Sequence, residues 1–139
     1  MKCGSDIVTL ADSRLKEADY LLQQGMWDGA YYLAGYSVEL LLKARVCKTL
    51  GIDDFFEFNK AKKELYRPYK VHDYQELIIL SGLYPELVKA QADITFKANW
   101  SLICNWGEES RYLTGKQEKE VREFVSSLIE ISKWIKGLL

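Results

Sequence analysis

Residues 30–46 read AYYLAGYSVELLLKARV, and this stretch indicates the fold class of the whole chain. Its apolar residues recur on nearly every side of a helix, which is typical of a helix surrounded by other helices. Glu39 and Lys43 stand one turn apart, so the predicted buried helix carries a small polar patch. We expect Asp28 to cap its start and Gly51 to follow its end. The stretch predicts the central helix of a bundle.

The segment before this helix predicts a second helix packed against it. Apolar residues recur there at spacings of three and four, from an opening at Ser5 or Asp6 to a stop at Gly25. The connection to the central helix is short, which favours an antiparallel hairpin. Two small residues of the central helix, Ala34 and Gly35, are expected to let a partner helix approach closely.

The second half of the chain predicts further helices. Asp73 and Glu76 form a capping pair for a helix that closes at Gly82. Pro85 stands at a first helical position, and one helix is expected from there towards Trp106. The apolar side of that helix is predicted to contain Leu87, Val88, Ala92, Ile94 and Leu102.

The last segment, residues 116–139, carries an apolar stripe at three/four spacing, with Trp134 beside it as additional core. No stretch alternates with the period of a strand. We therefore predict an all-α chain, an up-and-down bundle of four or five helices that forms a single domain over residues 1–139. The stripe is formed by Val121, Phe124, Leu128, Ile131, Ile135 and Leu138.

The composition excludes several classes of protein. Nineteen basic and twenty acidic residues leave a net charge of −1, so no overall field attracts nucleic acid or an anionic membrane. Cys3, Cys47 and Cys104 include no CxxC pair, which indicates reduced thiols and no zinc site. There is neither a signal-peptide pattern nor an apolar run of membrane-spanning length. We expect a cytoplasmic protein without metal, cofactor or membrane contact.

A row of side chains on the central helix is the first candidate site. Tyr32, Tyr36, Glu39 and Lys43 follow one another at helical spacing on one side. The charged pair is either an internal polar tie or part of a groove for a ligand or partner. The aromatic pair is interpreted as an interface between two subunits.

Two further candidates lie in the middle of the chain. Residues 60–70 combine lysines with tyrosines, the composition of a single-strand binding surface, but they follow acidic residues and are interpreted as a solvated connector. Arg67 and His72 could hold a phosphate and move a proton, as metal-free ribonucleases do. Pro68 interrupts this segment, and His72 is interpreted as the residue that precedes the cap Asp73.

A fourth candidate has the form W-x2-E-x-R-Y and consists of Trp106, Glu109, Arg111 and Tyr112. These side chains can lock the loop by stacking and an ion pair. They can also present a planar surface and a guanidinium to a nucleotide. Both interpretations stay open at this point.

Together these motifs resemble the HEPN domain family. The resemblance rests on YYLAGYSVELLLKARV, on the VHD segment that begins at Val71, and on the W-x2-E-x-R-Y segment, and it extends from Asp12 to Ile135. HEPN domains are small helical bundles, usually homodimers, first proposed as nucleotide-binding modules. Many pair with a minimal nucleotidyltransferase as a toxin–antitoxin module, and others are metal-free RNases.

The resemblance implies a regulatory role more than a catalytic one. The RNase branch uses an R-x4-6-H motif placed towards the last helix, commonly with a polar residue after the arginine. The one match in this chain is Arg67 and His72, with Pro68 after the arginine, in the middle connection. We therefore predict the non-catalytic or regulatory partner of a minimal nucleotidyltransferase. A polar groove between helices or subunits is expected to be lined by Glu39, Lys43, Arg111 and Tyr112.

The partners that follow are a second copy of the chain, the nucleotidyltransferase, and a nucleotide or RNA. Tyr32, Tyr36 and Trp134 present more apolar surface than a small bundle comfortably covers, so a homodimer is expected. Two alternatives remain: an RNase toxin that uses Arg67 and His72, and a helical interaction module without a nucleotide site.

Overall fold

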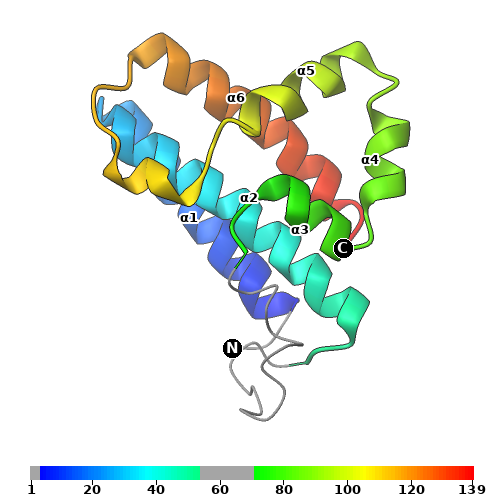
Figure 1. Cartoon of the computed structure of the whole chain (residues 1–139). Helices are drawn as coiled ribbons and strands as arrows, with labels where there is room; N and C mark the ends of the chain where they lie inside the picture. The colour runs from blue at the N-terminus through cyan, green and yellow to red at the C-terminus, as the bar shows by residue number, and fades with distance from the viewer. Residues whose placement is uncertain (1–3, 54–70) are drawn as a thin grey trace.

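The structure is a computed structural model that describes residues 4–53 and 71–139. These residues form six α-helices and one short 3-10 helix, and no strand occurs among them (Figure 1). The predicted all-α class is confirmed for this part of the chain. In chain order the elements are α1 (Ser5–Gln23), α2 (Trp27–Leu50), α3 (Tyr74–Leu80), α4 (Tyr84–Ala90), α5 (Ile94–Ile103), η2 (Glu108–Tyr112) and α6 (Glu118–Lys136).

Helices α1 and α2 form the predicted antiparallel hairpin (Figure 1). Gly25 makes the turn between them with φ of 76°, a conformation that glycine adopts without steric cost. Gly51 ends α2 as predicted, with φ of 65°, and its N–H bonds to the carbonyl oxygens of Cys47 and Lys48. The sequence therefore marked the stop after α1 and the end of α2 correctly.

The predicted cap at the start of α2 is wrong. Met26 occupies the N-cap position and makes no side-chain cap, whereas Asp28 lies inside the first turn. The Asp28 carboxylate instead accepts the N–H groups of Gly115, at 3.2 Å, and Lys116, at 2.8 Å. A carboxylate in a first helical turn also suits the positive end of the helix dipole. Asp28 thus ties the segment before α6 to the start of α2.

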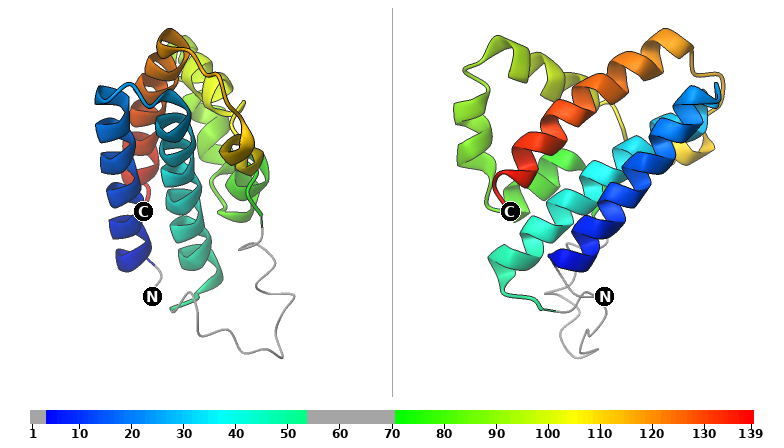
Figure 2. Two further views of the ribbon diagram at one scale, coloured as in Figure 1. Left: turned by 90° about the vertical axis from the view of Figure 1, so that its left-hand side faces the viewer. Right: turned by 180° about the vertical axis from the view of Figure 1, so that it is seen from behind.

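Helix α2 is central in the fold, as predicted. It contacts α1, α3, η2 and α6, and in Figure 2 it lies between α1 on one side and α3 and η2 on the other. Fourteen of its residues are buried, which leaves it without a solvent-facing stripe. A helix that is apolar on nearly all sides is stable in water only in such surroundings.

The remaining helices do not continue a regular up-and-down order. Tyr74, at the start of α3, bonds to Gly35, whereas Ser81, just after α3, accepts a hydrogen bond from Thr49 at 2.6 Å. Helix α3 therefore runs alongside α2 in the same direction. Helix α6 also follows α2, because it begins beside Asp28 and ends where Arg45 donates to the carbonyl oxygen of Leu138 at 3.2 Å. Helices α4 and α5 and the loop to η2 lead the chain from the end of α3 back towards the start of α6 (Figures 1 and 2).

The single helix expected from Pro85 to Trp106 is two helices, which corrects the prediction. Asp93 caps the second helix by accepting the N–H groups of Thr95, at 2.8 Å, and Phe96, at 3.2 Å. Because the chain bends at this cap, three predicted core residues are exposed instead: Ala92, Val88 at 52% and Ile94 at 84%. The capping pair at Asp73 is confirmed, since its carboxylate accepts the N–H of Glu76 at 3.0 Å.

The stripe of α6 is buried as predicted. Leu138, just after the end of the helix, is partly buried against the same core. Trp134 packs edge-on against Phe96 of α5, with ring centroids 5.0 Å apart. It is therefore additional core within this chain. Among the helices of the described ranges, none combines the length and apolar character needed to cross a membrane.

Candidate functional site

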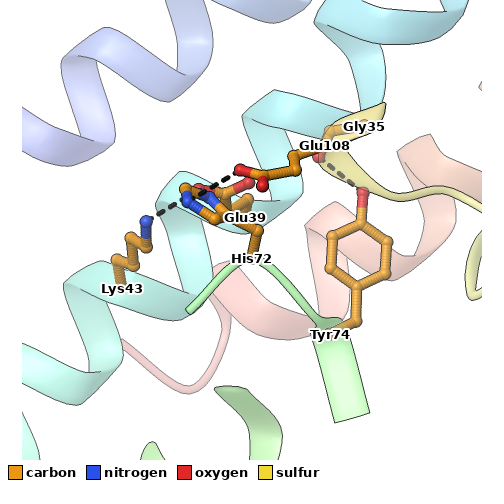
Figure 3. A network of polar contacts seen from close by, with 6 residues as sticks. All are labelled: Gly35, Glu39, Lys43, His72, Tyr74 and Glu108. Atoms are coloured by element: carbon orange, nitrogen blue, oxygen red, sulfur yellow. Dashed lines mark hydrogen bonds and ion pairs between the residues drawn. The ribbon is translucent and has the colours of Figure 1, made fainter. Parts of the chain in front are cut away.

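The candidate site is built around the Glu39 carboxylate of α2 (Figure 3). Glu39 is 1% exposed and Lys43 is 4% exposed. The Lys43 ammonium lies 2.7 Å from Glu39 Oε1, one helical turn away. Removal of two charges from water is costly unless they pair, and this geometry provides the pair. The two side chains form an internal polar tie, which is one of the two predicted roles.

His72 extends this tie to a second part of the chain. Its Nδ1 lies 2.8 Å from Glu39 Oε1, and its Nε2 lies 2.9 Å from Glu108 Oε2. The imidazole thus bridges α2 to η2 (Figure 3). His72 does precede the cap Asp73 as predicted, but it also makes contacts that the sequence did not indicate.

Glu108 is the site residue that the sequence analysis missed. The motif W-x2-E-x-R-Y selected its neighbour Glu109, which is exposed, whereas Glu108 meets the histidine. The available signal was the presence of two adjacent glutamates after Trp106, either of which could face the bundle. Only the path of the loop determines which one does.

A second cluster joins the same elements through aromatic side chains. The Tyr74 hydroxyl donates to the carbonyl oxygen of Gly35 at 2.5 Å, and the Tyr74 ring stacks on Trp106 with centroids 5.3 Å apart. A Cβ atom on Gly35 would overlap the Trp106 indole. The small size of Gly35 therefore lets the loop residue Trp106 pack against the backbone of α2. The sequence had suggested that a partner helix would pack at this position.

The aromatic row of α2 belongs to this cluster. Tyr32 stacks on Trp106, with centroids 6.0 Å apart, and on Tyr36, with centroids 6.1 Å apart. Both tyrosines are partly buried within their own chain. The predicted lock of the loop is present in the sense that Trp106 is held by stacking, at 4% exposure. Such stacked pairs add about 0.5–1.5 kcal/mol beyond their buried area.

Burial and the Glu39 charge keep the nearby phenols neutral. Burial, followed by the Glu39 carboxylate, raises the pKa of Tyr74 well above its ordinary value. The same two causes raise the pKa of Tyr36. Burial also raises the pKa of the Cys104 thiol to about 12. None of these groups is activated as a nucleophile or base at neutral pH.

A cleft of about 630 Å³ opens beside His72, between the start of α3 and the loop that leads to η2. Four carboxylates line it, from Asp73, Glu76, Glu108 and Glu109. Among the described residues, neither lysine nor arginine contributes to its lining. The described walls of the cleft therefore carry four carboxylates beside His72.

The other predicted residues fall outside this cleft. Arg111 and Tyr112 are exposed at the end of η2, with the guanidinium 5.0 Å from the Tyr112 ring centre. They are not in the tie formed by Glu39 and Lys43, so one shared groove is not formed within the chain. Arg67 and the basic and aromatic run at residues 60–70 lie outside the described residues.

No group of three or more histidine, cysteine, aspartate or glutamate side chains is placed to hold a metal ion within the described ranges. Comparison of the chain with protein-family models, with curated proteins and with solved structures finds no match.

Proposed function

We propose that this chain is the non-catalytic or regulatory partner of a minimal nucleotidyltransferase, in a toxin–antitoxin-type pair, and that it has a HEPN-like bundle. The sequence motifs supply the class of partner. The observation that supports a protein partner is the acidic cleft beside His72. Basic side chains of a partner protein complement such a surface.

The charge of the cleft favours this proposal over binding of a nucleotide or RNA. Phosphate groups would have to approach four carboxylates without a lysine or arginine on the described walls. Like charges at contact distance oppose binding, whereas opposite charges steer association and select the partner. We therefore propose a protein, and not a nucleotide or RNA, as the partner that binds this cleft.

The residues that follow the cleft wall along the chain, called the rim below, have the composition of a protein interface. They are Arg111, Tyr112 and Leu113, and Tyr112 is 74% exposed. Arginine and tyrosine are enriched among residues that contribute most to protein binding. We place the contact with the nucleotidyltransferase at this rim and at Glu108 and Glu109.

A homodimer is part of the proposal. Tyr32, Tyr36 and Trp134 pack partly within their own chain, so they supply less free surface than the sequence suggested. Other apolar side chains remain exposed, among them Tyr20 at 62% and Ile79 at 62%. Light scattering at tens of micromolar tests this point, and a monomer at that concentration contradicts it.

A tagged pull-down from the native host, with quantitative mass spectrometry, tests the main proposal. We expect a minimal nucleotidyltransferase in stoichiometric amount. The double variant Glu108→Gln/Glu109→Gln should reduce its recovery about tenfold, because two negative charges of the cleft wall are lost. The matched control Glu86→Gln/Glu123→Gln removes two glutamates that pair with lysines elsewhere on the surface and should leave recovery unchanged.

An eluate that contains only this chain contradicts the pairing with a nucleotidyltransferase. That result would favour the alternative of a helical module without such a partner. Equal recovery with both double variants would instead show that the partner binds away from the cleft.

One observation favours the RNase alternative. The buried Glu39 holds Nδ1 of His72, an arrangement that orients a general base, while Nε2 lies 2.9 Å from Glu108 at the wall of the cleft and would have to leave it to act. In that proposal His72 is the base and Arg67 stabilises the phosphorane. RNA degradation by the purified protein in EDTA, lost in His72→Ala, would support it. The absence of degradation at micromolar protein would exclude it.

A further inference from the structure

The contacts of His72 place a requirement on its protonation. Both ring nitrogens lie within hydrogen-bond distance of carboxylate oxygens, Nδ1 at 2.8 Å from Glu39 and Nε2 at 2.9 Å from Glu108. A neutral imidazole carries one N–H and can donate to one carboxylate. Only the imidazolium donates to both.

We propose that His72 is a proton-operated latch. As the imidazolium it ties Glu108 of η2 to Glu39 of α2, and loss of one proton releases η2 from the start of α3. The latch controls the wall of the acidic cleft. This inference does not depend on the proposed partner, because it follows from the proton count at three side chains.

The surroundings determine which of the two bonds opens. Glu39 is buried and already accepts from Lys43, so it has no access to water and retains the Nδ1 proton. The Glu108 side chain is 46% exposed and can be solvated when it is released. After deprotonation the Nε2 lone pair would face the Glu108 carboxylate, which is repulsive. The bond to η2 is therefore the one that is lost.

Other charges near the latch act in the same direction. Asp73 and Glu76 at the start of α3, and Glu109 beside Glu108, line the same cleft. Their negative charges repel the Glu108 carboxylate once the histidine is neutral. On the α2 side, Lys43 is the opposing cation, but it is held by Glu39.

The released part is limited by the aromatic cluster. Trp106 is fixed between Gly35 and Tyr74, so the loop before Gly107 stays in place. Beyond it, η2 contacts α2 and buries Ser110, and the Gly107 N–H bonds to the Ser110 hydroxyl at 3.4 Å. We therefore expect loss of the His72 bond to loosen residues 107–112, as one wall of the cleft, without detaching them from α2.

NMR on the full chain tests the latch, because His72 is the only histidine and gives one set of ring signals. At low pH both ring nitrogens should be protonated. On raising the pH, the chemical shifts of the backbone amides of Glu108 to Tyr112 should change with the same titration midpoint as the signals of the His72 ring. Above that midpoint, their exchange with solvent, corrected for its intrinsic pH dependence, should be about tenfold faster.

The variant Glu108→Gln separates a latch from a mere neighbouring charge. It alters a side chain on the surface, and the spread of amide signals verifies that the variant is folded. The titration midpoint shared by the His72 ring and the η2 amides should disappear in Glu108→Gln and persist in the matched control Glu109→Gln. Amides of η2 that do not follow the ring, or that follow it equally in Glu108→Gln, would overturn the proposal.

Discussion

Glu39 and Lys43 form an ion pair at 2.7 Å inside the bundle, on one helix and one turn apart. On an exposed helix such a pair contributes about 0.2–0.5 kcal/mol. Here both side chains are buried, and removal of one partner leaves a buried charge. We expect Glu39→Leu to lower the free energy of unfolding by about 3–5 kcal/mol, measured by urea unfolding.

The double variant Glu39→Leu/Lys43→Met tests the cause of that loss. It removes both charges and should recover a large part of the stability, since an apolar pair of similar volume often replaces a buried ion pair. The exposed pair of Lys119 and Glu123 provides the control, and Glu123→Gln should cost less than about 0.5 kcal/mol. A double variant no more stable than Glu39→Leu contradicts this explanation.

Gly35→Ala should destabilise the protein, although alanine is the better helix former by about 1 kcal/mol. The added methyl group overlaps the Trp106 indole, and such overpacking typically costs about 1–3 kcal/mol. Thermal unfolding measures the difference. Gly29→Ala in the first turn of the same helix is the control, because its methyl group meets only the flexible end of Leu21 at 3.1 Å. Equal effects at both glycines would argue against the close approach of Trp106.

Tyr31 should make the stability depend on pH in the alkaline range. Burial raises its pKa from 10.0 to about 12, with smaller contributions from Glu120 and Glu109. The neutral phenol is thus favoured in the folded chain. Its contribution is complete below the unfolded pKa of 10.0 and is lost as the pH rises through about 12.

Urea unfolding between pH 9 and 12 measures this effect in the wild type and in Tyr31→Phe. The variant lacks the ionisable group, so its stability should fall less steeply over that range. Tyr20→Phe changes an exposed tyrosine of α1 and should follow the wild type. Parallel curves for the wild type and Tyr31→Phe would show that the phenol does not contribute.

Calorimetry with ATP tests the loop that contains Arg111. We expect no binding heat, because the cleft beside this loop is lined by carboxylates. A heat signal that is abolished by Arg111→Ala would contradict this expectation and restore the nucleotide-binding role. Lys89→Ala on α4 is the control for a general loss of positive charge, since this lysine is exposed and pairs only weakly, at 3.7 Å, with Glu86.

Much of the local structure could be predicted because its causes are local. The hairpin of α1 and α2, the end of α2 at Gly51 and the cap at Asp73 all follow from residues within a few positions of one another. The stripe of α6 follows from spacing alone. The exceptions are the start of α2, where Asp28 lies inside the first turn, and the break at Asp93, where a cap between two short helices interrupts a pattern that suggested one.

The candidate site was only partly predictable, because its contacts join residues far apart in the chain. The sequence placed Glu39 next to Lys43 and singled out His72 and Trp106. It did not indicate that His72 bridges to Glu108, since loop residues lack the periodicity that assigns a side chain to one face. Nor could it distinguish an exposed polar groove from a buried tie.

The sequence by itself determined that the chain is helical, where its central helix lies, and that this helix carries a charged pair. Only the tertiary structure decided what surrounds the pair. It places Trp106 against Gly35 and both ring nitrogens of His72 against carboxylates. The physical reason is that helix periodicity and caps are set by neighbours along the chain, whereas burial and pairing depend on how distant segments pack.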